Sequence, residues 1–129
     1  MTWAANYIGI PYKLHGRDRL GIDCWGLVRM VLKEQFDINV PSLDGKYEAD
    51  DEEGVTDLID ETKALIKAEK VNTPLDGDIV VLRYLGYTTH VGIVVGDCIL
   101  HASGVKMTAL QKISSPHMMH RIQGYYRVS

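Results

Sequence analysis

Cysteine is scarce in this chain, because among its 129 residues only Cys24 and Cys98 carry a thiol. Two cysteines in unrelated sequence contexts are poor material for a disulfide framework, which relies on several bridges to hold a small fold together. We therefore expect both side chains to be free thiols.

Long apolar runs and an excess of positive charge are missing as well. No segment approaches the roughly 20 apolar residues of a membrane span, and the N-terminal residues lack the basic start of a secretory signal. The sequence thus predicts a protein made in the cytoplasm, with no membrane contact. A formal net charge of -3, with both signs interspersed, argues against a nucleic-acid partner held through its phosphates.

Hydrophobic residues make up 46% of the chain, enough for the core of one domain, which we expect to span residues 1–129. Periodicity and turn residues predict helices first and then strands, the order of an α+β fold with an antiparallel sheet. The expected helices are 2–8, 24–35 and 55–69, a charged glycine-containing loop is expected over 15–21, and the expected strands are 76–82, 91–95, 98–102, 107–113 and 122–128.

An acidic segment, Asp44 to Gly54, precedes the third expected helix. Acidic residues suit the positive end of a helix dipole, so we interpret this segment as a solvated helix start. Calcium binding needs a different ligand spacing.

Two histidines, His90 and His101, fall on one predicted β-hairpin. Gly96-Asp97 is its two-residue turn, which pairs Val95 with Cys98. Because side chains on one face recur every second residue, one face is wholly apolar and should lie against the core: Val91, Ile93, Val95, Cys98, Leu100 and Ala102. The other face carries His90, Gly92, Val94, Ile99, His101 and Ser103. The imidazoles are then diagonal neighbours about 7 to 8 Å apart at the backbone, close enough for their rings to share a hydrogen bond.

Cys24 is expected to be the first residue of the second helix, with Asp23 as its N-cap. Backbone N–H groups and the dipole at a helix start stabilise a thiolate and can hold an oxyanion, although the charge of Asp23 opposes the thiolate. If the helix packs across the hairpin face that bears His90, with Gly92 leaving room, then His90 is placed as a general base and His101 as its orienter. This is the arrangement of nucleophilic acyl transfer.

Each of these residues also has a simpler interpretation. A single cysteine on an apolar stripe is commonly a small core residue, and a single histidine is commonly a surface or satisfied core residue. A zinc site using Cys24, His90 and His101 is another class of interpretation, but the close ligand pairs of usual zinc motifs are absent. We expect no metal and no cofactor, Cys98 in the core, and surface positions for His15, His117 and His120.

Four stretches of sequence follow one another in a recognisable order: Gly9 to Gly16, Gly21 to Val28, Thr89 to Ile93, and Leu100 to Ser103. They resemble the motifs of the NlpC-type cysteine peptidases, small papain-like enzymes that cut the peptides of the bacterial cell wall. Pro74 to Val81 also resembles the strand that precedes the histidine in that family. The resemblance spans nearly the whole chain and implies a papain-like fold, with N-terminal helices packed on a central antiparallel β-sheet.

The resemblance implies a role for several residues. Cys24 matches the nucleophile, His90 the general base, and His101 the polar residue that orients the base. Tyr12 matches a tyrosine whose hydroxyl points toward the oxyanion or the substrate. Asp23 matches an acidic residue of the substrate cleft, facing the amino end of the stem peptide.

Two positions depart from the family pattern. Trp25 stands where serine is common, and His15-Gly16 stands where two glycines are common. Both changes concern the rim of the cleft and therefore the choice of substrate. The form of Asp23 to Gly26 resembles members encoded by tailed phages and prophages, which implies tail-tip proteins as partners and delivery to the wall by a virion or by lysis.

We therefore predict a cysteine peptidase that hydrolyses an amide of bacterial peptidoglycan through a Cys24 thioester, without a cofactor. The resemblance places the bond in the stem peptide, between D-glutamate and the diamino acid. Two other classes remain open: a non-catalytic structural or assembly component of a phage tail tip, and a peptidoglycan amidase or acyltransferase on the same scaffold.

Overall fold

The computed structural model describes residues 3–43, 61–84, 87–102 and 107–128. Its main sheet contains β3 (Glu69–Val71), β4 (Ile79–Tyr84), β5 (Tyr87–Val95), β6 (Cys98–His101), β7 (Ala109–Lys112) and β8 (Ile122–Arg127). The two-residue strands β1 (Arg17–Asp18) and β2 (Gly21–Ile22) form a small separate sheet. The helical elements are the 3-10 helix η1 (Trp3–Asn6), α1 (Cys24–Phe36), residues 61–65 and α3 (Pro116–Met119). Within these ranges, no helix is both long and apolar enough to cross a membrane.

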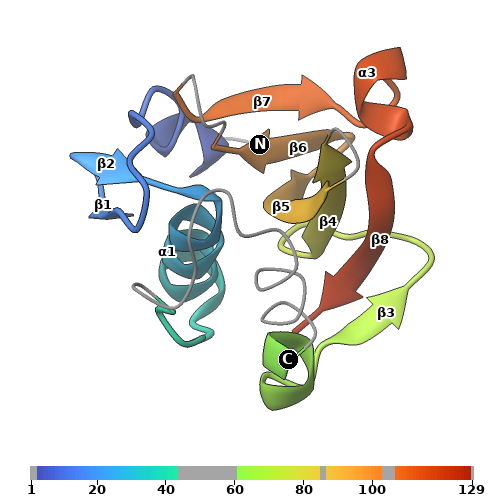
Figure 1. The fold of residues 1–129 in the computed structure, drawn as a ribbon, viewed down its shortest axis with the longest axis horizontal. Helices are drawn as coiled ribbons and strands as arrows, with labels where there is room; N and C mark the ends of the chain where they lie inside the picture. The colour runs from blue at the N-terminus through green and yellow to red at the C-terminus, as the bar shows by residue number, and fades with distance from the viewer. Residues whose placement is uncertain (1–2, 44–60, 85–86, 103–106, 129) are drawn as a thin grey trace.

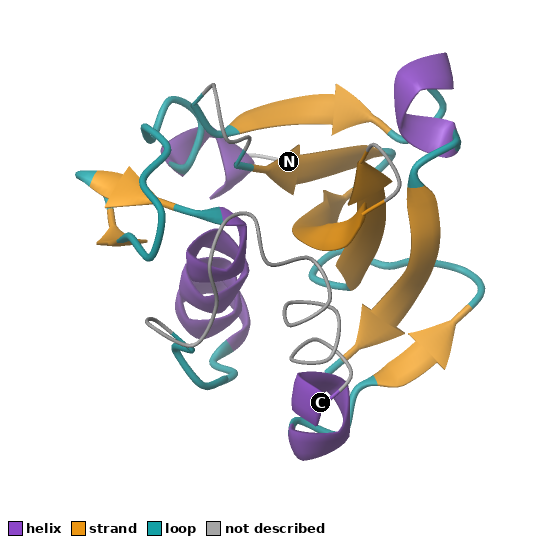
Figure 2. Ribbon diagram, in the orientation of Figure 1, coloured by secondary structure: helices purple, strands orange, loops and turns teal. Residues whose placement is uncertain are grey.

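The six strands lie in the order β3-β8-β4-β5-β6-β7, and every neighbouring pair is antiparallel. The sheet curls from β7 to β3, with α1 on one side and α3 between β7 and β8 along the chain (Figure 1). Strands dominate over helices (Figure 2). The predicted α+β class with a central antiparallel sheet is confirmed.

Helix α1 begins and ends at residues whose backbone geometry suits a helix end. Asp23 is the predicted N-cap, because its extended backbone lets the side chain accept a hydrogen bond from the Gly26 amide at 2.9 Å. At the other end Asp37 takes the left-handed conformation, φ 54°, and its N–H bonds to the Leu32 carbonyl. The helix predicted over residues 24–35 is confirmed, and it extends one residue further to Phe36.

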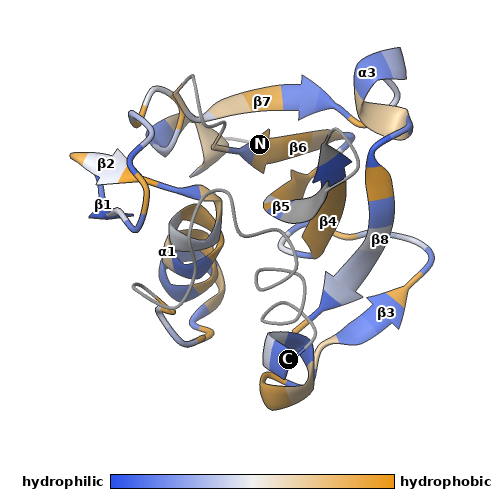
Figure 3. Ribbon diagram, viewed as in Figure 1, coloured by the Kyte–Doolittle hydropathy of each residue, from blue (hydrophilic) through white to orange (hydrophobic). Residues whose placement is uncertain are grey.

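The hairpin of β5 and β6 has the predicted register, with Val95 opposite Cys98, Val94 opposite Ile99, and Ile93 opposite Leu100. Gly96 takes φ 59°, the left-handed conformation that this tight turn requires at its first position. Hydrophobic residues concentrate on β4, β5 and β6 (Figure 3). The predicted apolar face lies in the main core, except that Cys98 at its end is only partly buried. Ser103, which is expected on the histidine face, lies outside the described residues.

Helix α1 packs on that apolar face, so the supposition that it packs across the histidine face is wrong. The main core joins both elements, as the buried cluster of Leu27, Val28, Val31, Val91 and Ile93 shows. Gly92 makes room for β6 instead, because a β-carbon there would lie 2.7 Å from Ile99 Cγ2 and 3.1 Å from His101 Cβ. Helix α1 packs on the apolar face because its apolar stripe buries more hydrophobic surface there than it would against the histidine face.

The histidine face of the hairpin is covered as well, by a second and smaller cluster. Its buried members are Val80, Leu82, Val94, Ile99 and Met118. Helix α3, which we did not predict, supplies Met118, and it starts with Ser115 as N-cap and Pro116 in its first turn. Serine followed by proline is a helix-start signal that the sequence did contain. The imidazoles therefore lie beside buried apolar side chains rather than on a solvated surface.

Three other expectations are corrected. The expected loop over residues 15–21 contains the β1–β2 hairpin, in which Arg17 pairs with Ile22. The expected helix over 55–69 is helical at residues 61–65, where Leu65 is 70% exposed, and Lys67 at φ 56° precedes β3. The expected helix over 2–8 is the shorter η1. Residues 55–60 and the acidic segment Asp44 to Gly54 lie outside the described residues.

We expect replacement of Gly26 by alanine to destabilise the fold. Alanine normally favours a helix over glycine by about 1 kcal/mol. Here a β-carbon would overlap the carbonyl oxygen of Gly16 and lie 2.9 Å from Ile22 Cγ1, and a backbone atom cannot rotate away. We expect Gly26→Ala to lower the free energy of unfolding, measured by urea denaturation, by about 1–3 kcal/mol.

Lys33→Ala on the exposed side of the same helix is the matched control, and it should change the free energy of unfolding by less than about 0.5 kcal/mol. A Gly26→Ala protein that is more stable than the wild type would contradict the expected clash.

Candidate active site

The thiol of Cys24 lies where the first turn of α1 meets β5. Its sulfur accepts hydrogen bonds from the backbone amides of Val91 and Trp25. Over the described residues, the pairing of β5 with β6 runs from Val95 only as far as Ile93, so Val91 lies beyond the end of this ladder. Cys24 therefore contacts the residue that follows His90, although α1 covers the opposite face of β5.

The side chains of His90 and His101 are hydrogen-bonded, as their diagonal placement on the hairpin predicted. His90 Nε2 lies 2.9 Å from His101 Nδ1. The rings are T-shaped, with centroids 5.1 Å apart and planes at 85°. Only 5% of His101 is exposed. The pair is therefore held in one geometry inside the fold.

Gln111 on β7 extends this contact, and sequence reasoning missed it. Its Oε1 lies 2.6 Å from His101 Nε2. Gln111 pairs with Ile99, two residues before His101, so the two side chains are on one face of the sheet. The sequence signal was the alternation along β7, but its use requires the register between β6 and β7, which the alternation by itself does not give.

Burial keeps the thiol protonated. Burial, and then the charge of Asp23, raise the pKa of Cys24 to about 11. The amides of Val91 and Trp25 and the charge of Arg17 act in the opposite direction but are weaker. At neutral pH Cys24 is therefore a thiol.

Burial also keeps the imidazoles uncharged. Burial, and then the charges of His101 and Arg121, lower the pKa of His90 to about 3. Burial lowers the pKa of His101 too, against the opposing effect of its hydrogen bond to Gln111. The resting site thus holds a neutral thiol and two neutral imidazoles, rather than a thiolate and an imidazolium.

Asp23 is the centre of a buried polar network at the start of α1. It is 1% exposed, and besides capping Gly26 it accepts hydrogen bonds from Arg17 Nη1 at 2.8 Å and from the His15 amide at 2.9 Å. Arg17 also donates to the carbonyl oxygens of Gly16 and Ser42. The N-cap role of Asp23 is confirmed, and its role toward a substrate stays a prediction. His15, expected at the surface, is half-buried and belongs to this network.

Tyr12 and Trp25 flank the thiol in different ways. Tyr12 bridges to Ile22, and burial, followed by the charges of Cys24 and Asp23, raises the pKa of Tyr12 to about 12. The phenol therefore keeps its proton and remains a hydrogen-bond donor. The indole of Trp25 is 9% exposed and donates from Nε1 to the Pro41 carbonyl at 2.8 Å. Its side chain packs in the main core, and the expected role of Trp25 toward a substrate stays a prediction.

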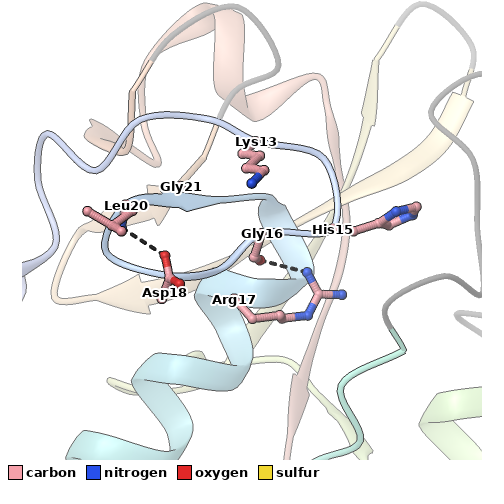
Figure 4. Close-up of a pocket in the computed structure, with 7 residues that line it drawn as sticks. All are labelled: Lys13, His15, Gly16, Arg17, Asp18, Leu20 and Gly21. Atoms are coloured by element: carbon pink, nitrogen blue, oxygen red, sulfur yellow. Dashed lines mark hydrogen bonds between the residues drawn. The ribbon is translucent and has the colours of Figure 1, made fainter.

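A hollow of about 260 Å³ lies against the β1–β2 hairpin (Figure 4). Its lining residues are Lys13, His15, Gly16, Arg17, Asp18, Leu20 and Gly21. Leu20, at the tip of the hairpin, is 89% exposed. Because neither Cys24 nor His90 lines it, this hollow is next to the thiol site and not part of it.

Among the described residues, no group of three or more histidine, cysteine, aspartate or glutamate side chains is arranged to hold a metal ion. The alternative of a zinc site at Cys24, His90 and His101 therefore gains no support. Cys24 and Cys98 are both free thiols, as predicted. His117 and His120 are exposed, also as predicted.

The sequence and the fold of this chain are similar to those of known proteins. A sequence profile described as the NlpC/P60 family matches residues 9–127. The chain belongs to the NlpC/P60 family. It is 28% identical over 129 residues to the murein DD-endopeptidase MepS/murein LD-carboxypeptidase of Escherichia coli K12, and equally to the proteins of the same name in strains O6:H1 and O157:H7. The match covers 99% of this chain but only 61% of each of these relatives.

Solved structures share the NlpC/P60 fold. A protein similar to lipoproteins of the NLP/P60 family from Staphylococcus aureus matches with a TM-score of 0.68 at 22% identity, covering 97% of this chain and 38% of that one. The NlpC/p60 domain of the peptidoglycan hydrolase SagA matches with a TM-score of 0.63 at 21% identity, covering 98% and 92%. The predicted NlpC-type fold is confirmed. NlpC/P60 members are cysteine peptidases and peptidoglycan hydrolases, so the predicted enzyme class is confirmed at the level of the family.

We expect the two arginines of the β1–β2 hairpin to differ sharply in their effect on stability. Arg17 and Asp23 form a buried pair, with 14% and 2% of their side chains exposed, so Arg17→Met should cost about 3–5 kcal/mol in the free energy of unfolding by stranding a buried carboxylate. Arg19 and Glu34 form a pair that is 48% and 38% exposed, so Arg19→Met should cost at most about 1 kcal/mol. Equal losses in urea denaturation would contradict this ranking.

The resting state of Cys24 predicts how its reactivity depends on pH. Since its pKa is raised to about 11, the thiolate fraction should rise about tenfold per pH unit between about pH 6 and 9. Alkylation by iodoacetamide in a Cys98→Ser background should follow that slope, as measured by mass spectrometry. Cys24→Ala in the same background is the control for other sites. A plateau below neutral pH would instead reveal a preformed thiolate–imidazolium pair.

Proposed function

We propose that this protein is a cysteine peptidase that hydrolyses an amide bond in the stem peptides of bacterial peptidoglycan. The supporting observation is the hydrogen bond of His90 to His101 beside a thiol at a helix start, in a chain of the NlpC/P60 family. In this proposal Cys24 is the nucleophile, His90 the general base, and His101 the group that orients the base.

The reaction then runs in two halves. His90 takes the proton of Cys24 as the sulfur attacks the carbonyl carbon, and gives that proton to the leaving amine when the C–N bond breaks. A thioester remains on Cys24. In the second half His90 takes a proton from a water molecule as the water oxygen attacks the thioester. The C–S bond then breaks, and His90 returns the proton to the sulfur of Cys24. Because the thiol and the imidazole are neutral at rest, the proton of Cys24 passes to His90 in the course of the reaction.

Two donors are suited to the oxyanion of this reaction. The Asp23 side chain accepts a hydrogen bond from the Gly26 amide, and the Asp23 carbonyl accepts one from the Leu27 amide. In this proposal the donor at the helix start is therefore the amide of Trp25, which faces the sulfur. The hydroxyl of Tyr12 is the second, since its raised pKa of about 12 keeps it protonated. Donors fixed before the reaction stabilise the developing charge without reorganisation.

For the bond, we propose the amide between D-glutamate and the diamino acid, on the resemblance of the motifs around Cys24 and His90 to the NlpC-type peptidases. The Escherichia coli relatives are named for DD-endopeptidase and LD-carboxypeptidase activities, so the bonds of those reactions are the alternatives. Fragment masses separate the three.

We further propose that the protein is made in the cytoplasm and acts as part of a phage or prophage tail tip, with tail proteins as partners. The support is the resemblance of Asp23 to Gly26 to tail-associated members. Detection of the chain by mass spectrometry in purified tail particles tests this proposal, and particles that cut cell wall yet contain no copy of the chain would contradict it.

The decisive test is digestion of purified peptidoglycan, followed by mass spectrometry of the soluble fragments. Wild type should release fragments, and Cys24→Ala and His90→Ala should release none, because nucleophile and base have no substitute. His101→Ala should lose less activity than His90→Ala, since an orienting group is partly replaceable. Cys98→Ala is the matched control and should keep full activity, because the partly buried Cys98 side chain lies against Asp97 at the hairpin turn.

Each rival function predicts a different result. Full activity in Cys24→Ala would end the peptidase proposal. No cleavage by the wild type, alone or in tail particles, would indicate a non-catalytic tail component. Fragments cut between sugar and peptide would indicate an amidase, and transfer of an acyl group to an added amine would indicate an acyltransferase.

A further inference from the structure

We propose that Gln111 sets the direction of the hydrogen-bond chain that makes His90 a base. Three side chains from three neighbouring strands form this chain: Gln111 Oε1 lies 2.6 Å from His101 Nε2, and His101 Nδ1 lies 2.9 Å from His90 Nε2. In this proposal Gln111 is a positioning residue, because it acts through His101 and touches neither the thiol nor the substrate.

The direction follows from the chemistry of the groups. An amide oxygen only accepts hydrogen bonds, so His101 Nε2 carries the proton in its contact with Gln111. A neutral imidazole has one N–H, so His101 Nδ1 is an acceptor, and His90 Nε2 must donate to it. The single ring proton of His90 is therefore on Nε2, and the lone pair on Nδ1 is the one that receives the thiol proton.

The opposite direction would disable the base. If a donor replaced the amide oxygen at position 111, His101 Nε2 would become an acceptor and Nδ1 would carry the proton. His101 would then donate to His90 Nε2, and the proton of His90 would stand on Nδ1, where it blocks transfer from the thiol. One acceptor on β7 thus decides which ring nitrogen of His90 carries the proton, and therefore whether His90 is able to act as a base.

The acceptor is also uncharged, which matters for the strength of the base. The positive charge of Arg121 acts on His90, and the carboxylate beside the thiol, Asp23, already pairs with Arg17. Tyr12 beside Cys24 is protonated. A glutamine fixes the tautomer without adding a negative charge to this environment, so His90 is oriented but stays a weak base. The catalytic use of this arrangement rests on the proposed function, whereas the tautomer order does not.

The test compares an acceptor-only with a donor-only residue at this exposed position, Gln111→Glu with Gln111→Lys. In ¹⁵N-histidine-labelled protein at neutral pH, NMR should find His101 as the Nε2–H tautomer in the wild type and in Gln111→Glu, and as the Nδ1–H tautomer in Gln111→Lys. In a Cys98→Ser background, alkylation of Cys24 should be at least about tenfold faster in Gln111→Glu and at least about tenfold slower in Gln111→Lys.

Lys112→Glu is the matched control, because it changes charge on the neighbouring residue of β7, whose side chain is on the other face of the sheet. It should leave the alkylation rate within about twofold. If Gln111→Lys does not fold, Gln111→Met tests the same point, and loss of the acceptor should give mixed tautomers and a slower rate.

Equal alkylation rates in Gln111→Glu and Gln111→Lys, or a His101 that keeps Nε2–H in the lysine variant, would overturn the proposal. Neither measurement uses peptidoglycan. A protein that shows the tautomer reversal but cuts no peptidoglycan would therefore support the direction of the chain and contradict the proposed function alone.

Discussion

The rest of the site depends on the hydrogen bonds and the ion pair that the buried carboxylate of Asp23 accepts. One buried group caps α1 through Gly26, receives the guanidinium of Arg17, and fixes the backbone at His15. A buried charge is tolerated only with such donors around it. These contacts join the first turn of α1 to the β1–β2 hairpin, while the main core packs α1 against β5. At this junction the sulfur of Cys24 meets the amide of Val91.

The same carboxylate has an electrostatic consequence. Together with burial it disfavours a thiolate at Cys24, while burial and nearby positive charge disfavour an imidazolium at His90. Stability and reactivity are thus coupled through one network, since Arg17 offsets part of the effect of Asp23. The resulting site is neutral at rest, which agrees with an uncharged Gln111 at the end of the histidine chain.

Much of the hairpin and of the helix start was predictable, because the relevant interactions are local in sequence. The turn at Gly96-Asp97 fixes the register of β5 and β6, and the register puts His90 and His101 on one face. The cap at Asp23 depends on a residue three positions away. These local rules predicted the contact between the imidazoles and the position of Cys24 as the first residue of α1.

The sequence by itself determined which side chains of the hairpin share a face and where α1 begins, because periodicity and turn geometry act over a few residues. Only the tertiary structure decided that α1 covers the apolar face of β5, that Arg17 neutralises Asp23, that β8 lies between β3 and β4, and that Gln111 meets His101. The β1–β2 hairpin brings Arg17 to Asp23. The other contacts join segments that are separated along the chain, so their partners are selected by burial of apolar area and by satisfaction of buried polar groups, which act on the whole fold at once.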